Sequence, residues 1–160
     1  MSGSFTHIDK KGNPQMVDVS LKSITDRKAT ARSIVWLGPD VVKHLVDGEI
    51  VTRKGPVFHT AIIAGTMAAK KTSELIPFCH PLNLDWININ IKMENSNTVL
   101  IDSSVSVEAK TGAEMEALVA VNIAALTIYD MCKALSHDIV IGESRLIKKT
   151  GGKSDINLMS

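Results

Sequence analysis

The order of the expected elements predicts an α+β fold, a ferredoxin-like sandwich in which an antiparallel sheet carries its helices on one face. Three observations lead to this class. The chain has 160 residues, 44% hydrophobic and 22% charged, which fits one globular domain. Strict alternation of apolar and polar residues after Trp86 predicts an antiparallel hairpin. Segments with helical spacing flank this hairpin, and that order is the split βαβ arrangement.

The N-terminal half supplies one strand and two helices. Residues 29–37 are predicted to be a strand, with Ala31, Val35 and Leu37 in phase. The Gly-Pro-Asp sequence that follows breaks the strand and begins a short helix over residues 41–46, which Gly48 ends. Apolar and small residues recur at three- and four-residue steps over residues 57–73, so we expect a second helix there.

The C-terminal half supplies the hairpin, the longest helix and a last strand. Isoleucines alternate with polar residues from Trp86 to Glu94, Asn95-Ser96-Asn97 forms the turn, and alternation resumes over residues 99–107. The longest helix is expected over residues 112–134, with two glutamates near its N-terminus, where carboxylates are favoured. Residues 139–147 then complete the sheet as a strand.

Composition narrows the function classes. A net charge of +1 is not the basic footprint of a nucleic-acid-binding protein. No signal peptide is evident, and no segment approaches the about 18 apolar residues of a membrane helix. Two cysteines, Cys79 and Cys132, are expected to be free thiols in a reducing compartment. We therefore expect a cytoplasmic protein without nucleic-acid or membrane partners, with a flexible leader (1–15), one catalytic domain (16–154) and a C-terminal tail (155–160).

Asp130 and Lys133 are three residues apart on the longest helix, so their side chains are neighbours on one face. One interpretation is an exposed ion pair, worth only about 0.3–0.5 kcal/mol. The other is an acid/base couple, because the apolar sequence around the pair suggests partial burial that would move both pKa values toward usable ones. The spacing alone leaves both open.

Glu114 and Glu116 also have two interpretations, as partners of the helix dipole or as site residues. Glu116 precedes Asp130 by fourteen residues, which places the two near one face of the helix but about 21 Å apart. One small substrate cannot touch both in one chain. If both act in one site, that site must lie between subunits.

Cys79 and His80 lie in an expected loop, since Pro77 and Pro81 both oppose a helix. Adjacent Cys-His without further ligands is a poor zinc site, and no metal site is predicted. A Cys nucleophile with a His base is possible but unspecific. Lys54, and Lys149 together with Lys153, are candidate anion binders; the Gly-Gly-Lys-Ser sequence lacks the first glycine of a phosphate loop. A phosphorylated small molecule is the expected ligand.

These residues belong to a longer pattern that resembles the molybdenum cofactor biosynthesis protein C family, the cyclic pyranopterin monophosphate synthases. The pattern runs in order from about Met16 to Ser154. Its blocks are Met16-Val17-Asp18-Val19-Ser20, the segment from Ala64-Gly65 to Lys70-Lys71, Leu75-Ile76-Pro77-Phe78-Cys79-His80-Pro81-Leu82, Thr111-Gly112-Ala113-Glu114-Met115-Glu116-Ala117-Leu118, Ala125-Leu126-Thr127-Ile128-Tyr129-Asp130-Met131-Cys132-Lys133-Ala134 and Lys149-Thr150-Gly151-Gly152-Lys153.

The resemblance implies a phosphorus–oxygen lyase that acts in molybdenum cofactor (molybdopterin) biosynthesis. Its substrate would be 3',8-cyclo-7,8-dihydro-GTP, made by a radical enzyme of the pathway, and its products cyclic pyranopterin monophosphate and pyrophosphate. It also implies a homohexamer, a trimer of dimers, with acid/base catalysis at subunit interfaces. No cofactor is required by the sequence, although Mg²⁺ could assist by bridging substrate phosphates.

The resemblance also assigns site residues. It implies that Asp130 and Lys133 are the central acid/base pair. The expected substrate-binding residues are Lys54, Cys79, His80, Glu114, Met115, Glu116 and Lys149. Proton transfers suit the ring steps, and cations suit the charge that develops on a leaving pyrophosphate.

Three positions depart from the family pattern: Ile62 replaces a cation, Ala113 replaces a valine, and Asp155 replaces a glycine. Loss of the cation at Ile62 could weaken triphosphate binding. Two other functions stay open: a nucleotide-binding or assembly subunit that retains the site without chemistry, and a hydrolase that depends on Cys79.

Overall fold

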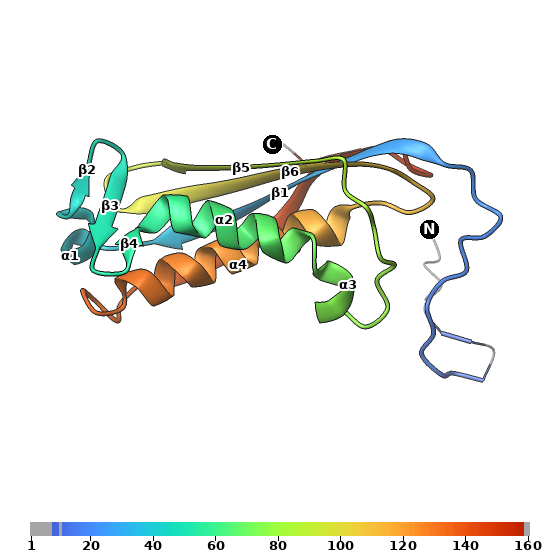
Figure 1. The fold of residues 1–160 in the computed structure, drawn as a ribbon, viewed down its shortest axis with the longest axis horizontal. Helices are drawn as coiled ribbons and strands as arrows, with labels where there is room; N and C mark the ends of the chain where they lie inside the picture. Colours follow the sequence, from blue (N-terminus) through green and yellow to red (C-terminus); the bar gives the residue numbers. More distant parts are fainter. Residues whose placement is uncertain (1–7, 10, 159–160) are drawn as a thin grey trace.

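A five-stranded antiparallel sheet carries two long helices on one face (Figure 1). This computed structural model describes residues 8–9 and 11–158. The elements in chain order are β1 (Thr25–Trp36), α1 (Pro39–Val42), β2 (Leu45–Val46), β3 (Glu49–Thr52), β4 (Gly55–Pro56), α2 (Val57–Ala69), α3 (Thr72–Leu75), β5 (Trp86–Met93), β6 (Thr98–Ala109), α4 (Glu114–Cys132), β7 (Val140–Thr150) and β8 (Ile156–Asn157). The α+β class and the antiparallel sheet with helices on one face are confirmed.

The sheet has the strand order β5-β6-β1-β7-β8. Strand β1 pairs with β6 along its full length, from Thr25 opposite Ala109 to Trp36 opposite Thr98, and with β7 on its other side. The chain passes from β1 to β5 through α2, and from β6 to β7 through α4. A second, three-stranded sheet, β2-β3-β4, lies between β1 and α2 in the sequence.

The alternation predicted for the hairpin is confirmed in β5 and β6. Ile89 is buried on the helix-facing side of β5, while its neighbours Asn88 and Asn90 are exposed. The longest predicted helix is also confirmed, with small differences at both ends, as α4. Its buried face is rich in alanine, which lets α2 approach closely: a Cβ on Gly65 would lie 2.7 Å from the carbonyl oxygen of Ala120.

The predicted helix over residues 41–46 is wrong. Helix α1 ends at Val42, and Val46 belongs to strand β2. The reason is a turn: Asp47 and Gly48 both have positive φ, 50° and 80°, which is the geometry that favours Asp-Gly in a tight hairpin. Gly48 therefore joins two strands instead of ending a helix. The second predicted helix also ends early, at Ala69, and α3 follows it separately.

Helix α4 corrects one further expectation, because by length and composition it could cross a membrane, with a mean hydropathy of 1.4 over its best window. Half of that window is buried inside the protein, and α4 packs against α2 and against strands β1, β6 and β7. Its hydropathy is that of a core helix.

Both ends of the chain lie partly outside the described residues. Of the predicted leader, residues 1–7 and 10 are not described, and Ile8 forms an isolated bridge with Pro14. Of the predicted tail, residues 159–160 are not described, and Ile156 and Asn157 pair with the end of β7.

Candidate active site

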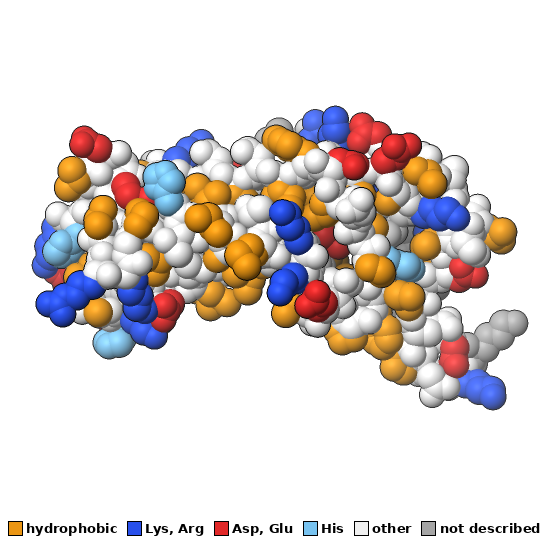
Figure 2. Space-filling model, in the orientation of Figure 1, with side chains coloured by type: hydrophobic (Ala, Val, Ile, Leu, Met, Phe, Trp, Pro, Cys, Tyr) orange, Lys and Arg blue, Asp and Glu red, His pale blue; other side chains and the backbone are white. Residues whose placement is uncertain are grey.

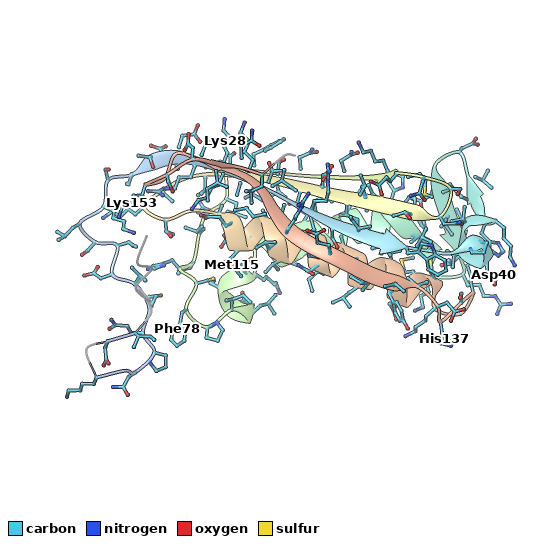
Figure 3. All side chains as sticks on the ribbon, turned by 180° about the vertical axis from the view of Figure 1, so that it is seen from behind. Lys28, Asp40, Phe78, Met115, His137 and Lys153 are labelled. Atoms are coloured by element: carbon cyan, nitrogen blue, oxygen red, sulfur yellow. The ribbon has the colours of Figure 1, made fainter. Side chains whose placement is uncertain are left out.

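A cavity of about 730 Å³ opens at the N-terminal end of α4. Segments far apart in the sequence line it: residues before β1, the loop after α3, the first turn of α4 and the end of β7. Six of the predicted site residues line this cavity: Cys79, His80, Glu114, Met115, Glu116 and Lys149. Figure 3 shows Met115 and Lys153 at this end of the molecule, opposite His137.

Glu114 and Lys149 form an ion pair across the cavity wall. Lys149 Nζ lies 2.8 Å from Glu114 Oε1, and both side chains are largely covered. Glycine at position 112 leaves room for this arrangement, because a Cβ there would collide with the Glu114 carboxylate. The pair joins the end of β7 to the first turn of α4.

Glu116 is the most deeply buried carboxylate of the site, with 3% of its surface exposed. Burial raises the pKa of this carboxyl to about 7, and the charge of Glu114 adds to the rise. A carboxyl that titrates near neutral pH exchanges protons readily under physiological conditions, so Glu116 suits general acid/base chemistry.

The Cys79 thiol, in contrast to the Glu116 carboxyl, is poorly suited to react near neutral pH. Burial and the nearby charge of Glu116 raise the pKa of this thiol above its ordinary value, which disfavours the thiolate form that a nucleophile requires. Burial and the charge of Glu116 thus make the cavity unsuited to the chemistry of the Cys79-dependent alternative.

Four more cations line the cavity: Lys22, Arg27, Lys28 and Lys153. Lys153 was expected from the sequence as an anion binder beside Lys149. The other three were missed, because they precede or begin β1 and nothing in their local spacing connects them with the rest of the site. Together they give the cavity wall a surplus of positive charge, which suits a phosphorylated ligand.

A second cluster, formed by Lys54, Asp130 and Lys133, lies at the C-terminal end of α4. Asp130 Oδ2 is 2.7 Å from Lys54 Nζ, and Asp130 Oδ1 is 2.7 Å from Lys133 Nζ. Lys54 also donates to the Asp130 carbonyl oxygen at 3.1 Å. Hydrogen bonds from Lys133 and Lys54 lower the pKa of Asp130 to about 2, and the bond to Asp130 raises the pKa of Lys133.

The expected movement of both pKa values of this pair toward usable ones is wrong for the single chain. About half of each side chain is exposed, 53% for Asp130 and 47% for Lys133, because both lie on the outer face of α4. Their pKa values move away from each other, so in this environment both groups stay charged.

The outer face of α4 between the two clusters is apolar. Val119 and Ile123 are half-buried, and Leu126 is 54% exposed. On α2, Ile63 and Met67 are exposed as well, and Figure 2 shows hydrophobic side chains over the two helices. We call these five residues the apolar helix face.

Ile62, the position of the missing cation, packs half-buried against the core. Within residues 8–9 and 11–158, no three His, Cys, Asp or Glu side chains are grouped so as to hold a metal ion.

The structure brings the predicted site residues together as two clusters at opposite ends of one helix.

Comparisons with known proteins agree on one family. A profile described as MoaC family matches residues 16–152. The chain is 51% identical to the cyclic pyranopterin monophosphate synthase of Heliobacterium modesticaldum over 94% of both chains. It is 49% identical to the molybdenum cofactor biosynthesis bifunctional protein of Synechocystis, spanning 96% of this chain and 45% of that protein. It is also 49% identical to molybdenum cofactor biosynthesis protein 1 of Dictyostelium discoideum, spanning 96% of this chain and 27% of that protein.

Proposed function

The chain belongs to the MoaC family, and we propose that it is a cyclic pyranopterin monophosphate synthase. In this proposal it converts 3',8-cyclo-7,8-dihydro-GTP into cyclic pyranopterin monophosphate, with release of pyrophosphate, in molybdenum cofactor biosynthesis. The 51% identity to a relative of that name over 94% of both chains supports the activity. The observation that carries the mechanism is the placement of two complementary clusters at the two ends of α4.

The complete site in this proposal lies between two subunits. Glu116 and Asp130 are separated by fourteen residues of continuous helix, which is about 21 Å. Antiparallel packing of two copies about a two-fold axis would set the Lys54–Asp130–Lys133 cluster of one copy against the cavity of the other, twice per dimer. The apolar helix face between the clusters would then be buried, which is a favourable contribution to association.

The cluster residues divide the chemistry between them. Lys149 and the other cavity cations bind the phosphates and neutralise the charge that develops on the departing pyrophosphate. Closure of the cyclic phosphate forms an oxygen–phosphorus bond and breaks the bond to pyrophosphate, so a base must take the proton of the attacking hydroxyl. Glu116 suits proton transfer through its pKa of about 7, and His80 and Glu114 position the substrate.

Asp130 and Lys133 would act from the partner subunit. Covering the pair with a second copy removes water, and desolvation moves the pKa values of an acid and an amine back toward neutral. The exposed, fully charged pair of the single chain would in this way become the acid/base couple. Lys54 holds Asp130 from the other side.

Assembly, location and fold class are further parts of the proposal. The protein would be a cytoplasmic homohexamer, a trimer of dimers, with a single catalytic domain over residues 16–154. The ferredoxin-like class is supported by the order β5-β6-β1-β7 with both crossover helices on one face. We propose no resident metal, and Mg²⁺ would enter only with the phosphates of the substrate.

Supplying the purified protein with freshly made 3',8-cyclo-7,8-dihydro-GTP tests this function. Pyrophosphate and the pterin product are expected from the wild type, and at least a hundredfold less from Lys133→Ala, a loss typical of removing an acid/base group. Lys92→Ala is the matched control, because Lys92 is an exposed lysine on β5. Substrate binding without product from an assembled wild-type protein would refute the synthase and support a binding or assembly subunit, with Ile62 as the first position to examine.

A further inference from the structure

Helix α2 begins without a cap from its own N-terminal sequence. Its N-cap is Pro56, which makes no side-chain hydrogen bond. The first N–H groups of a helix have no partner inside it and must find one elsewhere. Here the partner comes from β3: Glu49 Oε1 accepts from Phe58 N at 2.8 Å, and Glu49 Oε2 accepts from His59 N at 3.1 Å. Glu49 therefore caps α2 from a neighbouring strand.

The Glu49 carboxylate is fully engaged. Oε1 also accepts from Ile50 N at 2.8 Å, and Oε2 lies 2.6 Å from His59 Nδ1. Only 17% of the side chain is exposed. Burial opposes its ionisation, but the hydrogen bonds from Phe58 and His59 hold the pKa of Glu49 below its ordinary value. A fixed negative charge thus sits at the N-terminus of α2, where the helix dipole stabilises it.

These bonds close the base of the hairpin that carries Lys54. Strands β3 and β4 pair at only two positions, and one of the four residues, Pro56, has no N–H to donate. Strand β3 also pairs with β2, again at two positions, and pairing of this length has little stability of its own. At the tip, Thr52 Oγ1 accepts from Lys54 N at 3.2 Å. The Glu49 carboxylate therefore ties strand β3 to the first turn of α2 by hydrogen bonds, in addition to the chain connection from Pro56 to Val57 and the burial of Ile50 in the core.

The same carboxylate lies close to the end of α4. Burial raises the pKa of the Cys132 thiol to about 11, and the negative charge of Glu49 contributes to that rise. Cys132 is next to Lys133 in the chain and is completely buried. The charge of Glu49 thus acts on the helix end that presents Asp130, as well as on the hairpin that presents Lys54.

We propose that Glu49 is a positioning residue for the Lys54–Asp130–Lys133 cluster. By tying β3 to the first turn of α2, its carboxylate holds the hairpin so that the Lys54 ammonium reaches Asp130, 76 residues away in the chain. Its effect on catalysis rests on the function proposed above, whereas its effect on the geometry of the cluster does not.

An NMR titration of the Asp130 carboxyl in the full-length protein tests the geometry without substrate. Asp130 is faced by Lys54 and Lys133, with Tyr129 beside Lys133. Lys54→Ala is expected to raise the midpoint from about 2 toward the ordinary 3.8, because one of the two ammonium partners is lost. Glu49→Ala should produce most of the same rise. The matched control is Glu108→Ala, an exposed glutamate at the end of β6, and it should leave the midpoint unchanged.

A cap that only stabilises the fold would lower the melting temperature of Glu49→Ala but leave the Asp130 midpoint as in the wild type, and that result overturns the proposal. If Glu49→Ala does not fold, Glu49→Gln is the variant to test. Its amide oxygen can still accept one amide hydrogen bond, so it should raise the Asp130 midpoint by less than Lys54→Ala does. No rise in a folded Glu49→Gln would equally overturn the proposal.

Turnover separates this inference from the proposed function. If the synthase assignment holds, Glu49→Gln should lower kcat about tenfold, in parallel with Lys54→Ala. Full activity of Lys54→Ala, together with a shifted Asp130 midpoint in both Glu49 variants, would refute the catalytic part played by Lys54 and support the positioning role of Glu49. An unshifted midpoint would refute the positioning role whatever the activity.

Discussion

Mixing two inactive variants should restore activity if each site is shared between subunits. The first variant, Lys133→Ala, damages the cluster at the C-terminal end of α4; the second, Lys149→Ala, damages the cavity at its N-terminal end. In a mixed dimer, one site combines both lesions and the other site combines the two intact halves. The distance that requires sharing comes from the helix: Glu116 and Asp130 are about 21 Å apart along its axis.

The size of the recovery follows from the symmetry. Random pairing of equal amounts of the two variants produces about one half mixed dimers, and each mixed dimer has one intact site of two. The mixture should therefore show about one quarter of wild-type activity, while each variant alone shows close to none. Co-expression, or unfolding and refolding of the mixture, allows the subunits to exchange.

Pyrophosphate release is the assay, and a mixture of Lys133→Ala with Asp130→Ala is the matched control. Both of these lesions lie in the same cluster, so every site in every dimer contains a damaged cluster and no recovery is expected. If the Lys133→Ala and Lys149→Ala mixture is no more active than its two components, the shared site is refuted, and with it the geometric reasoning from α4.

Two further predictions concern stability. Burial raises the pKa of Glu116 from 4.5 to about 7. The contribution of this carboxyl to the free energy of unfolding is therefore complete below pH 4.5 and is lost as the pH rises through 7, a loss of about 3 kcal/mol. Glu116→Gln should remove this loss, so melting temperatures at pH 5 and pH 8 should differ less in the variant; an equal difference would contradict the buried carboxyl. Gly65→Ala should destabilise the protein by about 1–3 kcal/mol, since the new Cβ would lie 2.7 Å from the Ala120 carbonyl oxygen. Urea denaturation measures this destabilisation. The control is Gly152→Ala, because a Cβ on Gly152 would meet only the flexible end of an arginine at 3.4 Å. Equal denaturation midpoints for the two variants would contradict the tight packing of α2 on α4.

The fold class could be predicted because its main elements carry strong local patterns. Strand β5 alternates residue by residue, and α4 combines a long apolar stretch with carboxylates in its first turn. The small sheet β2-β3-β4 was missed because two of its strands have two residues each, too few for any period to show. Its one strong signal was Asp47-Gly48, a hairpin turn, which the reasoning used instead as the end of a helix.

Spacing alone could predict contacts within the site only where residues are close in sequence; the more distant members, such as Lys54 and Lys149, were expected from the family resemblance. Three-residue spacing made Asp130 and Lys133 neighbours on a helix, and the structure contains that ion pair. Lys54 joins them from 76 residues away and Lys149 meets Glu114 from 35 residues away. Such contacts depend on how the sheet and helices pack, so no local pattern indicates them.

The amino-acid sequence by itself determined the chemical groups of this protein, the helix that carries most of them, and the distance between the two ends of that helix. Only the tertiary structure decided the environment of each group. Glu116 and Asp130 lie on the same apolar helix, but packing of the fold buries the first and leaves about half of the second in water. Because the free energy of a charge depends on its surroundings, the first pKa rises to about 7 and the second falls to about 2.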